Sequence, residues 1–72
     1  MYERIRDHLE SNGIVYKHVA VKSRIERQRF YRIMRGNAPL LVDEYETICR
    51  DGLGIDPGYF FKQNVLDSKQ TS

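Results

Sequence analysis

Long polar side chains, most of them cationic, recur between residues 27 and 35 at a spacing that places them together on a helix. At 100° per residue, one stripe contains Gln28, Arg32 and Arg35, with Tyr31 beside it and Arg27 and Arg29 flanking it. Guanidinium and amide groups of this kind reach guanine and adenine edges or phosphate oxygens. A solvated helix face is the alternative, but such a face usually mixes both signs of charge, and this stretch has no acidic residue. The stripe therefore predicts contact with DNA.

The surrounding residues predict the elements that must position this stripe. Apolar residues at i, i+3 and i+4 (Phe30, Ile33 and Met34) fit the buried face of one helix, and Val15, Val19 and Ala20 fit that of a helix before it. The earlier segment, about 15–23, is rich in β-branched residues and could form a strand on propensity alone, but the neighbouring spacing favours a helix. Only Ser23–Glu26 remains between the two, so they predict a helix-turn-helix whose second helix can enter a DNA major groove.

This arrangement resembles the phage repressor and Cro-like (XRE-like) helix-turn-helix family. Ala20 stands where that family has a small residue at the helix crossing, and its usual apolar positions are occupied by Val19, Ile25, Phe30 and Ile33. The sequence Arg35-Gly36-Asn37 is similar to the end of the family's recognition helix, and the segment 53–61 is similar to its L-G-V-S-P-D-Y-F segment. The resemblance spans residues 2–61 and implies a compact, all-α, five-helix bundle of the lambda-repressor-like type.

The resemblance also implies roles for individual residues. Base edges are assigned to Arg27, Gln28 and Arg32, a thymine methyl group to Tyr31, and phosphates to Lys17, Arg35 and Asn37, with Tyr16 and Arg29 as further DNA-contacting positions. The chain departs from the family at the turn. Arg24 replaces a glycine and is expected to adopt a positive φ, Ser23 replaces an apolar residue, and Glu26 replaces the better N-caps Ser and Thr. About one extra residue lies near Gly52.

Three more helices are expected around this pair. Residues 2–12 place Tyr2, Ile5 and Leu9 on one face, with Gly13 as the C-terminal cap and His8 at the surface. A fourth helix is expected over about 41–51, with a buried stripe formed by Val42, Tyr45, Ile48 and Cys49. The fifth is capped by Asp56, with Pro57 at its first position. The domain is predicted to span residues 1–66, and 67–72 to form a flexible tail.

An apolar cluster near the end of the chain predicts a dimer. One recognition helix reads only a few base pairs, whereas a two-fold dimer reads a near-palindromic operator. Phe60 is expected to turn inward, leaving as the interface Tyr59, Phe61, Val65 and Leu66. The alternative is that all of them pack on the fourth helix and that the protein is a monomer off DNA.

Composition excludes several other classes of protein. The 72 residues suit one small domain, 40% of them are hydrophobic, and no apolar run is long enough to span a membrane. The N-terminus lacks a signal peptide's apolar core, and a single Cys49 suits a reducing cytoplasm, which the resemblance implies to be that of a prokaryotic cell. Residues 17–35 have seven Lys or Arg and one Glu, a net charge of +6. Since the whole chain is +2, the rest is −4, and this asymmetry is typical of nucleic-acid binding.

The sequence shows no pattern of residues typical of a metal site, a phosphate-binding loop or a catalytic nucleophile. His8 and His18 lie in different helices without a partner at metal-ligand spacing, and neither a phosphate-binding glycine loop nor a nucleophile with its base is recognisable. We therefore expect no enzyme, no metal, no cofactor and no small-molecule ligand. The sequence predicts a small, sequence-specific transcriptional regulator of double-stranded DNA, of phage or mobile-element type by resemblance. The alternatives are a protein-binding module of the same fold (an antirepressor or antitoxin-like partner) and an RNA-binding adaptor.

Overall fold

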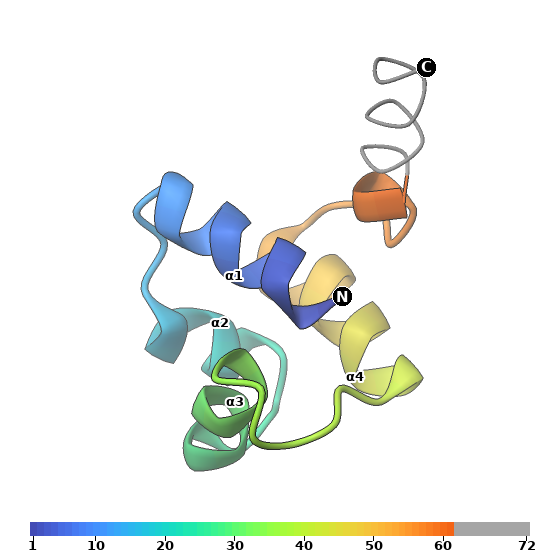
Figure 1. Ribbon diagram of the computed structural model, residues 1–72. Coiled ribbons are helices and arrows are strands. Elements are labelled where there is room, and N and C mark those ends of the chain that lie inside the picture. The colour runs from blue at the N-terminus through green and yellow to red at the C-terminus, as the bar shows by residue number, and fades with distance from the viewer. Residues whose placement is uncertain (62–72) are drawn as a thin grey trace, which may run out of the picture.

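The computed structural model describes residues 1–61, which form helices and no strand (Figure 1). In chain order the elements are α1 (Tyr2–Ser11), α2 (Tyr16–Lys22), α3 (Arg27–Met34), α4 (Val42–Thr47) and the π-helix η1 (Ile48–Leu53). The prediction of an all-α fold is confirmed for these residues. Val65, Leu66, the tail 67–72 and the domain boundary at residue 66 lie outside the described range.

The first helix forms as its periodicity predicts. Ile5 and Leu9 are fully buried and Tyr2 is half-buried, so one face of α1 supplies the core. The helix ends where Gly13 adopts a φ of +64°, and the next N–H, that of Ile14, donates to the carbonyl oxygen of Leu9 at 2.8 Å. Glycine adopts this left-handed conformation without a steric cost, which explains the cap.

The second helix forms despite its β-branched residues, and a short connection follows it. Val19 and Ala20 are buried on its inner face. Arg24 has a φ of +58°, as predicted from its replacement of a glycine. The N–H groups on either side of it bond back to α2, with Ser23 donating to Val19 at 2.9 Å and Ile25 donating to Ala20 at 3.0 Å. These bonds stabilise a tight turn around a non-glycine residue.

The third helix begins at Arg27, and Glu26 is its N-cap, as the sequence predicted. The Glu26 side chain accepts a hydrogen bond from the N–H of Arg29 at 3.2 Å. This glutamate therefore caps the helix as a Ser or Thr side chain usually does. Phe30, Ile33 and Met34 are all buried. α3 thus has the predicted inner face.

The predicted fourth helix is two elements, because η1 continues α4 with wider π turns. The backbone hydrogen bonds of a π turn span five residues, one more than those of an α turn. Gly52 is buried in η1, and a Cβ there would collide with the Oγ of Ser23 in the preceding connection. The lack of a side chain at Gly52 therefore lets its backbone approach Ser23 closely. Cys49, Ile48 and Tyr45 are buried as predicted.

Val42 corrects the predicted stripe of the fourth helix. Its side chain is 75% exposed, because no described element covers the first turn of α4 on that side. After η1 the chain turns at Asp56, whose Oδ2 accepts the N–H of Gly58 at 2.8 Å, so Asp56 closes a turn before the helix and is not its N-cap, and Pro57 is not its first residue. Helical backbone then begins at Tyr59, two residues later than predicted, and is described as far as Phe61.

One core joins all of these elements. Its members are Ile5, Leu9, Val19, Ala20, Phe30, Ile33, Met34, Tyr45, Ile48, Cys49 and Phe60. Phe60 is fully buried while Tyr59 and Phe61 remain 36% and 54% exposed, which confirms that one aromatic of this segment turns inward. Across residues 1–61 no helix has the length and apolar character needed to cross a membrane.

Candidate nucleic-acid interface

The outer side of α3 presents a group of exposed polar side chains. These are Arg27, Gln28, Arg32 and, at the C-cap, Arg35. Within the described part of the chain none of their side chains has a hydrogen-bond or ion-pair partner. Phe30, Ile33 and Met34 fix the opposite side of the helix in the core. The helix therefore presents three guanidinium groups and an amide to solvent without acidic neighbours in α3 itself.

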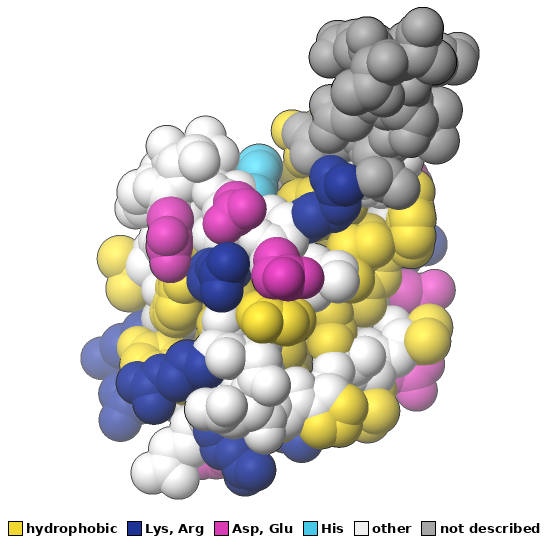
Figure 2. All heavy atoms as spheres, in the orientation of Figure 1, with side chains coloured by type: hydrophobic (Ala, Val, Ile, Leu, Met, Phe, Trp, Pro, Cys, Tyr) yellow, Lys and Arg dark blue, Asp and Glu magenta, His cyan; other side chains and the backbone are white. Residues whose placement is uncertain are grey.

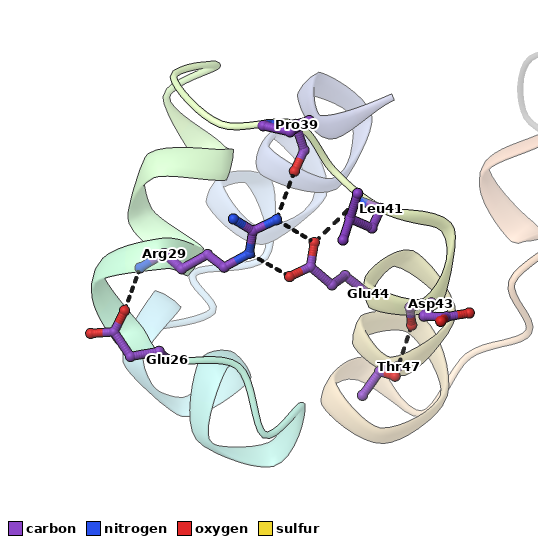
Figure 3. A network of polar contacts seen from close by, with 7 residues as sticks. All are labelled: Glu26, Arg29, Pro39, Leu41, Asp43, Glu44 and Thr47. Atoms are coloured by element: carbon purple, nitrogen blue, oxygen red, sulfur yellow. Dashed lines mark hydrogen bonds and ion pairs between the residues drawn. The ribbon is translucent and has the colours of Figure 1, made fainter.

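Arg29 differs from this group because its guanidinium is paired inside the molecule, and its assignment as a DNA contact stays a prediction. Its Nε donates to Glu44 Oε2 at 2.6 Å, and its Nη2 donates to Glu44 Oε1 at 3.0 Å and to the carbonyl oxygen of Pro39 at 3.2 Å (Figure 3). Glu44 Oε1 also accepts the N–H of Leu41 at 3.1 Å. A bidentate pair of this kind has a defined geometry, so it sets how α3 lies against the start of α4.

The environment of Glu44 favours its charged form. Hydrogen bonding from Arg29 lowers the pKa of Glu44 from its ordinary value of 4.5, and the N–H of Leu41 lowers it further. Partial burial acts in the opposite direction but is the smaller effect. Glu44 therefore neutralises Arg29 at neutral pH, and the net charge of the exposed surface comes from the other arginines.

Tyr16 also has a partner inside the molecule. Its hydroxyl donates to Glu10 Oε2 at 2.8 Å, and its ring meets the rings of Phe30 and Tyr31 edge to face at 5.9 and 5.7 Å. Burial, followed by the bond to Glu10, raises the pKa of Tyr16. Its proton is thus already donated to a carboxylate, so Tyr16 acts as a support for the half-buried Tyr31 rather than as a ready phosphate donor.

Three further predicted contacts lie at the ends of the two helices. Lys17 is exposed in the first turn of α2, Arg35 is the C-cap of α3, and Asn37 is exposed just after it. Sequence reasoning missed Lys22, an exposed cation in the last turn of α2. The feature of the sequence that could have indicated Lys22 is its position within the basic segment 17–35. In Figure 2 the Lys and Arg side chains gather at the end of the molecule formed by α2 and α3, whereas hydrophobic ones gather toward α4.

The C-terminal end of α3 is positioned by α1. Gly36 has a φ of +79°, and a Cβ at this residue would lie 2.5 Å from the hydroxyl oxygen of Tyr2. The Tyr2 ring also contacts Arg6, whose guanidinium carbon lies 5.6 Å from the centre of the ring. Only glycine satisfies both the backbone conformation and the close approach, so Gly36 fixes where Arg35 and Asn37 are presented.

Other chemistry finds no support among residues 1–61. These residues contain no group of three or more His, Cys, Asp or Glu side chains arranged to hold a metal ion. Cys49 is buried, and burial raises the pKa of its thiol, which makes it a poor nucleophile. His8, expected at the surface, is half-buried against the ring edges of Tyr59 and Phe60 at 5.7 and 5.6 Å.

Comparisons with protein-family models, with curated proteins and with solved structures found no match for this chain.

Proposed function

We propose that this chain is a sequence-specific double-stranded DNA-binding protein that regulates transcription, with α2 and α3 acting as a helix-turn-helix. The observation that supports this most directly is the outer side of α3. Arg27, Gln28, Arg32 and Arg35 are exposed there, and none is bonded to another described side chain. Four long polar groups on a helix anchored by a buried inner face are the means by which such helices contact base edges and phosphates.

The connection between the two helices supports the same reading. Arg24 adopts a left-handed conformation between α2 and α3, and Ala20 is 1% exposed in the core they share. A small residue at this position allows two helix backbones to approach closely. The arrangement then leaves the outer side of α3 free to enter a major groove about 12 Å wide.

Roles follow from the positions of the side chains. Arg27, Gln28 and Arg32 contact base edges, and Tyr31 packs on a thymine methyl group through its exposed part. Phosphates are bound by Lys17, Arg35 and Asn37, to which the structure adds Lys22 as a candidate. Tyr16 and Arg29 help to hold the interface in place through their hydrogen bonds to Glu10 and Glu44.

Selection of binding sites from random duplex DNA at moderate salt tests this function. A defined sequence is expected to be enriched by the wild-type protein and lost with Arg32→Ala. Arg50→Ala is a matched control, because it removes the same charge from an exposed position on η1. The absence of any enriched sequence would overturn the proposal. Equal binding of a single-stranded RNA competitor would favour the RNA-binding alternative instead.

A protein-binding module of the same fold is the second candidate function. It is favoured by exposed apolar side chains on the side of α4, where Leu41 is 52%, Val42 75% and Phe61 54% exposed. The two candidates differ in which substitution abolishes activity. Arg32→Ala is expected to abolish a DNA-dependent activity and to leave unchanged one that depends on a foreign protein alone.

A further inference from the structure

Arg6 lies where the first helix meets both helices of the proposed helix-turn-helix. Its guanidinium carbon is 5.6 Å from the centre of the Tyr2 ring. The hydroxyl of Tyr2 approaches Gly36 so closely that a Cβ at this glycine would lie 2.5 Å from the hydroxyl oxygen. Gly36 stands between Arg35 and Asn37, which are proposed to bind phosphates. A single aromatic ring thus holds Arg6 beside the C-terminal end of α3.

The electrostatic environment of Tyr16 shows that Arg6 is near α2 as well. Burial, followed by the hydrogen bond to Glu10, raises the pKa of Tyr16, whereas the positive charge of Arg6 lowers it. Because the effect of a charge on a phenol weakens with distance, Arg6 must lie close to this first residue of α2. The next residue, Lys17, is another proposed phosphate contact. The side chain of Arg6 therefore adjoins the phosphate-binding candidates of both helices.

The guanidinium of Arg6 has hydrogen-bonding capacity that no residue within 1–61 uses. Its one ion pair with these residues is to Asp7, with Nε and Oδ1 3.7 Å apart, which is too far for a hydrogen bond. Arg29 is the contrast, because Glu44 accepts hydrogen bonds from two of its nitrogens. The Arg6 side chain is 35% exposed, so a ligand can reach it. A guanidinium that an aromatic ring orients, and whose N–H groups are available, is well suited to bind a phosphate.

Two carboxylates of α1 lie near Arg6, and their positions limit their effect on a bound phosphate. At about 100° per residue, Arg6 shares one stripe of the helix with Tyr2 and Glu10. Asp7 is turned away from this stripe and lines a separate hollow on another side of α1. Glu10 already accepts the hydroxyl of Tyr16 at 2.8 Å. Arg6 therefore offsets the charge of Glu10 at a place where an unbalanced carboxylate would repel DNA.

We infer that Arg6 binds a phosphate of the DNA backbone, which makes α1 a third DNA-contacting element beside α2 and α3. The inference rests on the proposed function for its ligand and extends it, because Arg6 lies outside the basic segment 17–35. Phosphate contacts fix the position of a protein on the duplex without reading its sequence. Arg6 should thus strengthen binding to every duplex sequence and hold the domain in one orientation on the DNA.

The salt dependence of binding to the selected duplex tests this inference. Each phosphate that a protein neutralises contributes about 0.9 to the slope of log K against log salt concentration. Arg6→Gln is expected to make the slope shallower by about 0.9 for each bound chain and to weaken all sequences by the same factor. Arg6→Lys keeps the charge and should retain most of the slope. Arg4→Gln is the matched control, because it removes the same charge from the side of α1 that lines the separate hollow, and its slope should equal that of the wild type.

Duplexes with one phosphate replaced by an uncharged methylphosphonate give a second measurement. At one position of the site, this replacement should weaken the wild type and leave Arg6→Gln unaffected. A thermal melt checks that each variant is folded, and Arg6→Met, which keeps an unbranched stem against Tyr2, takes the place of Arg6→Gln if the latter does not melt cooperatively.

An unchanged slope in a folded Arg6 variant without the charge, or an equal loss with Arg4→Gln, would overturn the inference. If the wild type still selects a duplex sequence in that case, the proposed function stands and only the role of Arg6 falls. A wild-type protein that binds no duplex DNA would instead overturn the proposed function, and the role of Arg6 with it.

Discussion

Gln28 is the residue whose replacement should change sequence preference most cleanly. It is exposed on α3, uncharged and unbonded to any other described side chain, so its amide is available for one base. Gln28→Ala is expected to weaken binding to the selected site by about 1–3 kcal/mol and to relax preference at one base pair. Competition binding against a set of single-base variants of the site measures both effects.

Arg35→Ala provides the contrast for Gln28→Ala. Arg35 is proposed to contact a phosphate at the end of α3. It should therefore strengthen binding to all DNA sequences about equally, and its loss should flatten the salt dependence of binding. If Gln28→Ala leaves the preference profile unchanged, the assignment of Gln28 to a base edge is wrong.

Ser23 is a residue at which the molecule can be made more stable. Its side chain is 2% exposed, and its Oγ has no hydrogen-bond partner among residues 1–61. A buried hydroxyl without a partner costs about 1–3 kcal/mol, so Ser23→Ala is expected to raise the free energy of unfolding by about 1 kcal/mol. Thermal denaturation should show a rise of about 4–8 °C in Tm. Ser11→Ala, which removes an exposed hydroxyl, should change little; a lower Tm for Ser23→Ala would indicate that its oxygen is bonded after all.

At the scale of the elements, Ala20 reports on the packing of α2 against α3. It is 1% exposed, whereas Val21 beside it is 68% exposed. Ala20→Leu adds three carbons to a filled contact and is expected to destabilise the fold by roughly 1–3 kcal/mol. Val21→Leu, which adds one carbon at the surface, should stay within about 0.5 kcal/mol of the wild type. Equal melting curves for Ala20→Leu and the wild type would show that Ala20 is not at the crossing.

The pairing of α3 with α4 through Arg29 and Glu44 predicts a dependence of stability on pH. The pKa of Glu44 is lower in the folded protein than its ordinary 4.5, chiefly through Arg29. A lowered pKa means that the stabilisation is present above about pH 4.5 and is lost as the pH falls through the folded-state value.

Urea denaturation at several pH values checks this prediction. Glu44→Gln should be less stable than the wild type at pH 7, and the difference should shrink as the pH approaches 3. Glu46→Gln, an exposed position on the same helix with no hydrogen bond to a described residue, should follow the wild-type pH dependence. A constant difference between Glu44→Gln and the wild type across this range would show that the ion pair does not contribute.

At the scale of the whole molecule, the dimer predicted from the sequence should read two half-sites on one face of the duplex. Their centres are expected one helical turn apart, about 34 Å. Inserting five base pairs between the half-sites turns one of them to the opposite face, so binding should fall to that of a single half-site. An insertion of ten base pairs is the control for added length. If five inserted base pairs leave affinity unchanged, the two helices are not rigidly paired.

The periodicity of apolar residues within single helices determined by itself which side chains of those helices are buried. The burial of Ile5 and Leu9 in α1 and of Phe30 and Ile33 in α3 follows from spacing along one helix, and the exposure of Gln28 and Arg32 is its complement. The positive φ of Arg24 was expected from the resemblance, in which a glycine stands at this place, and it is likewise a local property. Each depends on residues within a few positions of one another, where helix geometry alone sets the relation.

Tertiary structure decided what depends on residues far apart in the chain. The sequence predicted Arg29 as another exposed cation, but α4 places Glu44 2.6 Å from it. The sequence likewise predicted Tyr16 as a DNA contact, but its hydroxyl donates a hydrogen bond to Glu10. The exposure of Val42 and the approach of Gly52 to Ser23 likewise depend on how the helices are placed. Periodicity says which side of a helix faces inward, but the partner of a half-buried polar side chain is set by the neighbouring helix, whose position is fixed only when the whole core packs.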